Sequence, residues 1–132
     1  MRVEWARSLA LDLPGGEARV TLGWLPFGDC LLAALTDCDR LGTLVEVVDG
    51  EARTLLGRGA QEETLEALAE LLAEAVAART GRARRLLFSF CLAPEQLARA
   101  EFQRALLAAF AAELTRDPLF APRIAVDPPL AG

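Results

Sequence analysis

The chain has 132 residues, of which 53% are hydrophobic and 25% charged, a balance typical of a folded protein rather than a disordered segment. Its net charge of −5 argues against nucleic acid as a partner, because phosphate binding needs clustered positive charge. No run approaches ~18 uninterrupted apolar residues, so we expect no membrane span. Residues 1–7 (MRVEWAR) lack the apolar core of a signal peptide, which favours the cytoplasm. We expect residues 1–132 to form a single domain.

The first part of the chain has the patterns of β-strands. Alternating apolar residues in 9–13 and 20–24 predict two half-buried strands, joined by a turn at Pro14-Gly15-Gly16. The segment 24–28 (WLPFG) interrupts the second pattern, and we expect an apolar loop there. A continuous apolar strand, covered on both faces, is predicted at 30–36.

A β-hairpin is predicted next, at residues 42–57. Its first strand is 42–48 and its second ends in Leu55-Leu56-Gly57. Between them, Asp49-Gly50 favours a type I′ turn, in which both central residues have positive φ. Short connections of this kind imply antiparallel pairing.

A helix with two stripes is predicted at 62–79. Leucine and valine recur along it at three- and four-residue steps and form an apolar stripe. The second stripe is acidic and consists of Glu62, Glu66, Glu70 and Glu74. It has two interpretations, a solvated face or a docking surface for a basic partner.

The remaining elements are one buried strand and one more helix. Residues 86–92 (LLFSFCL) form the strand, and an amphipathic helix begins at Pro94, which suits a first helical turn, and runs to Leu114. Residues 123–126 can add a short edge strand. The order β-β-β-β-β-α-β-α predicts an α+β fold, an antiparallel β-sheet of about six strands with two helices packed on it.

The residues that usually perform catalysis are few. Without histidine there is no Ser-His-Asp or Cys-His relay and no ordinary zinc site. Asp37 and Asp39 fit solvated turn acids better than a metal site, which needs more converging oxygen ligands. The Gly57-Arg58-Gly59 segment lacks the third glycine of a dinucleotide fingerprint. We therefore expect no enzyme, with no catalytic, cofactor-binding or metal residues.

Two apolar segments are candidate partner-binding sites. One contains Trp24, Leu25 and Phe27, and the other, after the last helix, contains Leu119 and Phe120. Exposed aromatic loops often mark protein interfaces, although both segments can equally fold under the protein and cap its core. A small antiparallel sheet also has free edges or an open face, so we expect a homodimer.

The order of elements, with the residues inside it, resembles the families of proteasome assembly chaperones 3 and 4. The matching features are the segment 42–45 (GTLV), Leu55-Leu56-Gly57 before the first helix, the strand 86–90 and the amphipathic second helix. A hairpin around residues 29–35 is also similar. The likeness extends over residues 5–114, whereas the arginine-only basic composition is typical of a bacterial protein.

This resemblance implies a dimer of antiparallel sheets with two helices each. It implies binding to proteasome α-type subunits during ring assembly, with no catalytic residues. The C-terminal residues 129–132 (PLAG) lack the hydrophobic-Tyr-X tail of other proteasome chaperones, as in families 3 and 4. We therefore expect a non-enzymatic, chaperone-like, dimeric protein acting on a partner protein. The alternative is a homodimeric small-molecule-binding or regulatory domain with a cleft between helix and sheet.

Overall fold

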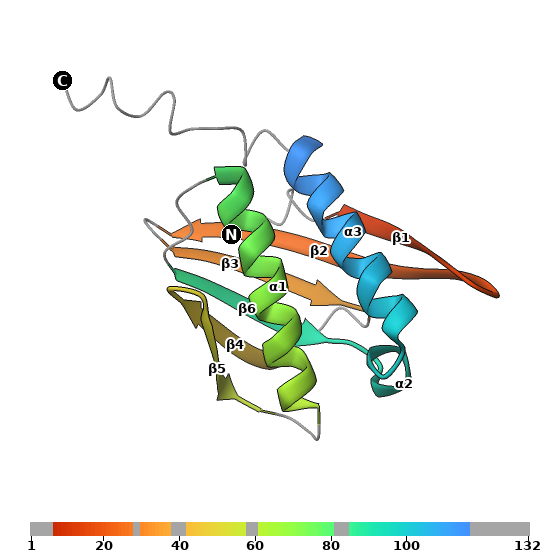
Figure 1. The fold of residues 1–132 in the computed structure, drawn as a ribbon, viewed down its shortest axis with the longest axis horizontal. Coiled ribbons are helices and arrows are strands. Elements are labelled where there is room, and N and C mark those ends of the chain that lie inside the picture. The colour runs from red at the N-terminus through yellow and green to blue at the C-terminus, as the bar shows by residue number, and fades with distance from the viewer. Residues whose placement is uncertain (1–6, 28–29, 38–41, 58–60, 81–84, 117–132) are drawn as a thin grey trace.

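A computed structural model describes residues 7–27, 30–37, 42–57, 61–80 and 85–116 of the chain. These residues form one six-stranded β-sheet with its helices on a single face (Figure 1). The strands are β1 (Arg7–Leu13), β2 (Gly16–Phe27), β3 (Cys30–Thr36), β4 (Thr43–Val48), β5 (Glu51–Leu56) and β6 (Arg85–Cys91). The helices are α1 (Glu62–Thr80), α2 (Pro94–Leu97) and α3 (Ala100–Arg116). The predicted α+β fold is confirmed.

The sheet has the strand order β1-β2-β3-β6-β4-β5 and is antiparallel except at one pair. The last strand in the sequence, β6, lies between β3 and β4, antiparallel to β4 and parallel to β3. A parallel pair requires a long connection, and β4, β5 and α1 together provide it. Local turn signals could not predict this pair, because they report only on strands that are adjacent in sequence.

The predicted hairpin forms between β4 and β5. Asp49 has φ 53° and Gly50 has φ 84°, so both central residues adopt the positive φ that a type I′ turn requires. The closing pair of this hairpin is Val48 and Glu51.

The core lies between the sheet and the two long helices. On α1, the predicted apolar stripe is buried, and on α3 the buried face includes Phe102, Leu106 and Phe110. The ring of Phe88 from β6 packs against Phe90 at 5.8 Å and against Phe110 at 6.4 Å between ring centroids. Burial of such a phenylalanine is typically worth about 3–5 kcal/mol when it is tested by truncation to alanine.

Three predictions about individual elements are corrected by the structure. The expected loop at 24–28 is wrong for its first four residues, because β2 continues to Phe27 and pairs with β3 along the whole of that stretch. Pairing alternates from the closing pair Phe27 and Cys30, so the position of Pro26 needs no N–H for bonding to β3 and a missing N–H is tolerated. The predicted second helix is divided into α2 and α3 at Ala98 and Arg99. The strand predicted at 30–36 is covered on one face and half-exposed on the other. The strand predicted at 123–126 lies outside the described residues.

Candidate functional site

The two edges of the sheet, β5 and β1, differ in how their unpaired backbone groups are satisfied. In a hairpin with a two-residue turn, the closing pair exchanges both hydrogen bonds, and the pairing then alternates along the strands. On β5, this alternation directs the N–H groups of Ala52 and Thr54 away from the sheet. An edge strand with such free groups is a template for pairing with another chain.

Two carboxylates of α1 bind these outward N–H groups on β5. Ala52 donates its backbone N–H to Glu70 Oε2 at 3.0 Å. Thr54 donates both its backbone N–H, at 3.1 Å, and its hydroxyl, at 2.6 Å, to Glu66 Oε2. Because a charged acceptor strengthens such bonds, both groups are well satisfied without a partner strand.

A third glutamate of the acidic stripe packs against the end of β5. A Cβ atom placed on Gly57 would overlap the carboxylate of Glu62, so the bare glycine allows the close approach of that side chain. The stripe is therefore neither a wholly solvated face nor a free docking surface, because Glu66 and Glu70 bind the sheet edge. The sequence signal that could have shown this is a pair of glutamates one helical turn apart, immediately after an edge hairpin.

The β1 edge has no comparable cover within the described chain. Its closing pair is Leu13 with Gly16, so the same alternation turns the N–H and C=O groups of Ser8, Ala10 and Asp12 outward. These three side chains are exposed and point to the face of the sheet opposite the helices, while Leu9 and Leu11 are buried beneath the helices. Among the described residues, no side chain accepts a hydrogen bond from these outward N–H groups.

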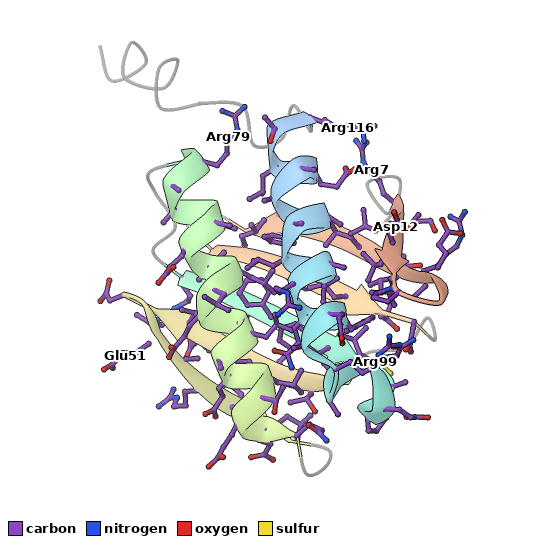
Figure 2. All side chains as sticks on the ribbon, turned by 45° about the vertical axis from the view of Figure 1, so that its right-hand side comes forward. Arg7, Asp12, Glu51, Arg79, Arg99 and Arg116 are labelled. Atoms are coloured by element: carbon purple, nitrogen blue, oxygen red, sulfur yellow. The ribbon has the colours of Figure 1, made fainter. Side chains whose placement is uncertain are left out.

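Side chains rather than backbone groups connect β1 to α3. Glu113, with a side chain only 8% exposed, lies 3.6 Å from Arg7 Nε and 3.4 Å from Arg116 NH1. Figure 2 shows Arg7 and Arg116 extending toward each other near the C-terminal end of α3. Within the described chain, Glu113 Oε1 has no hydrogen-bond partner, so these cations supply most of its compensation.

No described helix or strand covers the sheet face opposite the helices, which we call the open face, and its centre is partly apolar. Leu32, Leu44, Val48 and Leu87 are half-exposed there, on the central strands β3, β4 and β6. Glu46 stands among them, directly opposite Leu87 and between Leu44 and Val48 on β4. It lies 3.1 Å from Arg53 and 3.5 Å from Arg85, so one charged group divides the apolar surface. Half-exposed apolar side chains beside a charged group can form a contact surface for another protein. This face was not predicted as a site, because alternation alone does not show which face the helices cover.

The predicted partner-binding residues are only partly placed. Trp24, Leu25 and Phe27 belong to the end of β2, and the structure describes the backbone there. Leu119 and Phe120 lie outside the described residues. The prediction that these residues bind a partner stays a prediction.

Asp37, one of the two turn acids considered above, has a structural partner, and so does Arg79. Asp37 Oδ2 accepts the backbone N–H of Ala93 at 2.9 Å, which joins the end of β3 to the start of α2. Arg79, at the end of α1, donates to the carbonyl of Leu114 at 3.2 Å. Asp39 lies outside the described residues. In the part of the chain that the structure describes, no three carboxylate or thiol side chains come together as metal ligands would. Nor does any described helix have the length and apolar character to cross a bilayer.

The fold, with its covered and open faces, has a known counterpart. No protein-family model matches the chain, and no curated protein matches it. A crystal structure of a chaperone complex for yeast 20S proteasome assembly has the same fold, with a TM-score of 0.58 over 81% of this chain and 96% of that chain. The two sequences are 12% identical, so the likeness is one of architecture.

Proposed function

We propose that this protein is a non-enzymatic, chaperone-like protein that acts as a homodimer on a partner protein in the cytoplasm. The observation that carries the proposal is the open, partly apolar sheet face on a fold shared with a proteasome assembly chaperone. The partner class that this likeness favours is a proteasome-type α subunit or a related subunit of a self-compartmentalising protease.

The open face supplies the proposed contact surface for that partner. Leu32 and Leu87 stand on adjacent strands in direct register, and Leu44 lies on the next strand, so their half-exposed side chains form one patch. A partner covering this patch would remove apolar surface from water, worth about 25 cal/mol for each Å². The Glu46–Arg53–Arg85 group, which meets the patch at Glu46 opposite Leu87, would set the orientation of the partner rather than the affinity.

The end of β2 is the second proposed contact. Trp24, Leu25 and Phe27 stay proposed partner-binding residues, together with Leu119 and Phe120. No described strand pairs with β2 on its β1 side beyond Leu22, so a partner could reach the strand from that side. Truncation of Trp24 and Phe27 to alanine should then weaken capture of the partner more than it lowers the melting temperature.

Affinity capture from native lysate tests the function. The bait is the tagged full chain, compared with Leu87→Glu on the open face and with the matched control Leu71→Glu, which alters an exposed leucine of α1. We expect wild type and Leu71→Glu to recover α-type or related protease subunits, and Leu87→Glu, if folded by circular dichroism, to recover far less. Wild-type capture without any such subunit would overturn the proposal.

The alternative of a small-molecule-binding domain places its ligand between helix and sheet. Phe88, Phe102 and Phe110 are fully buried in that layer, and the rings of Phe88 and Phe110 contact each other. Because these large side chains fill the centre of the layer, the protein-binding function is the one the structure favours. Native mass spectrometry of the purified protein tests the alternative, which requires a bound small molecule.

A further inference from the structure

We infer that the homodimer forms through β1, which pairs antiparallel with β1 of a second copy about a two-fold axis centred on Ala10. This inference rests on the proposed function, which includes a homodimer, and identifies β1 as the surface through which the two copies bind. The starting observation is the difference between the two edges, since α1 binds the outward N–H groups of β5, whereas those of β1 have no acceptor within the described chain.

The register of this pairing follows from which backbone groups point outward. Ser8, Ala10 and Asp12 all direct their N–H and C=O groups away from β2. Centring the axis on Ala10 places Ser8 opposite Asp12 of the second copy and Ala10 opposite itself. All three outward residues of each strand are then paired, with about six interchain hydrogen bonds. Within Arg7–Leu13, shifting the axis to Leu9 or Leu11 leaves one outward residue of each copy without a partner in the other strand.

Charge complementarity favours a second copy over an unrelated strand. Within its own hairpin, Asp12 lies directly opposite Glu17, and like charges at that position repel. Arg19, on β2 opposite Ala10, extends over the same face toward Ser8, with its NH1 3.3 Å from the Ser8 hydroxyl. In the proposed register, Asp12 of the second copy lies beside Ser8, within roughly 5.5 Å between Cα atoms. Arg19 would therefore bind Asp12 of the second copy, twice in each dimer.

The flank of α3 above β1 is compatible with a second copy. Glu113 faces Arg7 of β1, and Ala109 and Ala105 lie one and two turns earlier on the same side of the helix. Small side chains at these positions leave room for the α3 helix of the second copy, which the two-fold axis brings to the same side of the sheet. Figure 1 shows α3 lying over β1 and β2, with the hairpin end of both strands extending past the helix.

A charge-swap mixture tests this surface directly. In homodimers of the Asp12→Arg variant, two arginines would face each other at each contact, and in homodimers of the Arg19→Asp variant, two aspartates would do so. In the heterodimer of an equimolar mixture, both contacts hold opposite charges. Arg19 of one variant faces Asp12 of the other, and at the second contact the introduced arginine faces the introduced aspartate. By light scattering after size exclusion, we expect wild type to be dimeric, each variant alone to dissociate at least tenfold more readily, and the mixture to recover heterodimers more stable than either homodimer.

A second variant tests the same surface through the backbone. Ala10→Pro removes an outward N–H without touching the β1–β2 hydrogen bonds, so the fold should persist while the dimer is lost. Circular dichroism melting confirms that each variant is folded. A wild-type monomer at high micromolar concentration would overturn both the dimer and this interface. Dimers that persist in both charge variants and in Ala10→Pro would overturn the β1 interface alone, leaving the dimer of the proposed function intact on another surface.

Discussion

The two edge strands of the sheet, β5 and β1, differ in whether side chains of the described chain bind their outward backbone groups. At β5, a helix reaches over the edge and two of its glutamates bind the strand's outward N–H groups. At β1, an ion pair between side chains joins the strand to the nearby helix, and no described residue binds the outward backbone groups of the edge. A sheet needs protection at every edge that is not an interface, so an unprotected edge beside a protected one indicates where pairing is permitted.

The largest loss of stability, and of the difference between the two edges, is expected when the β5 edge loses both of its carboxylate acceptors. In Glu66→Ala/Glu70→Ala, three hydrogen bonds to β5 disappear, and we expect unfolding in urea to show a loss of about 2 kcal/mol. The freed edge should also pair with other chains, giving species larger than a dimer in light scattering. Glu74→Ala, on the same stripe, is the control and should change neither property. Unchanged hydrogen exchange at Ala52 and Thr54 in the double variant would contradict the assigned role of these carboxylates.

The next largest effect is expected where β1 is attached to α3. Arg7→Leu deprives the buried carboxylate of Glu113 of one of the two cations that the described chain places beside it. We expect a loss of about 1–2 kcal/mol in urea unfolding, with faster hydrogen exchange in the last turns of α3. Arg53→Leu is the matched control, because its pair with Glu46 is exposed on the arginine side and surface pairs contribute about 0–1 kcal/mol. Equal losses in the two variants would show that Glu113 does not depend on Arg7.

A smaller loss of stability is expected when only the hydroxyl bond between Thr54 and Glu66 is removed. Thr54→Val keeps the backbone N–H that Glu66 accepts but removes the hydroxyl at 2.6 Å. The expected loss is about 1 kcal/mol, measured by thermal or urea unfolding, with no change in oligomeric state. Thr115→Val, which removes a hydroxyl bonded within its own helix at an exposed site, should change stability by less than about 0.5 kcal/mol. If the two variants behaved alike, the hydroxyl of Thr54 would have no special part in covering the edge.

The smallest effect is expected at the end of β5. Gly57→Ala forces the flexible side chain of Glu62 to move aside, with an expected loss of about 0.5 kcal/mol in urea unfolding. Because the clash is with Glu62 alone, the same substitution in a Glu62→Ala background should be neutral. If Gly57→Ala lost as much stability in the Glu62→Ala background as in wild type, the need for glycine would come from the backbone conformation rather than from contact with Glu62.

Much of the fold was predictable because its signals are local. The turn at Asp49-Gly50, the alternation of buried residues in β1 and the apolar stripe of α1 each depend on residues adjacent in sequence or one helical turn apart. The site was less predictable for the same reason. The bonds from Ala52 and Thr54 to α1 and the apolar patch of Leu32, Leu44 and Leu87 depend on the way distant elements meet. The end of β2 was misjudged because Pro26 signals a break unless the strand is known to lie on an edge there.

The central position of β6 has a consequence for synthesis on the ribosome. The chain emerges from its N-terminus, so β1 to β5 are all available before Arg85–Cys91 leaves the exit tunnel. Until then, the ribbon of β1, β2 and β3 and the hairpin of β4 and β5 cannot join, and each exposes an inner edge that β6 later fills. Non-local pairing of this kind is slow, and unpaired edges are prone to aggregate. A nascent chain stalled before residue 85 would therefore expose both inner edges, and we expect it to bind general chaperones.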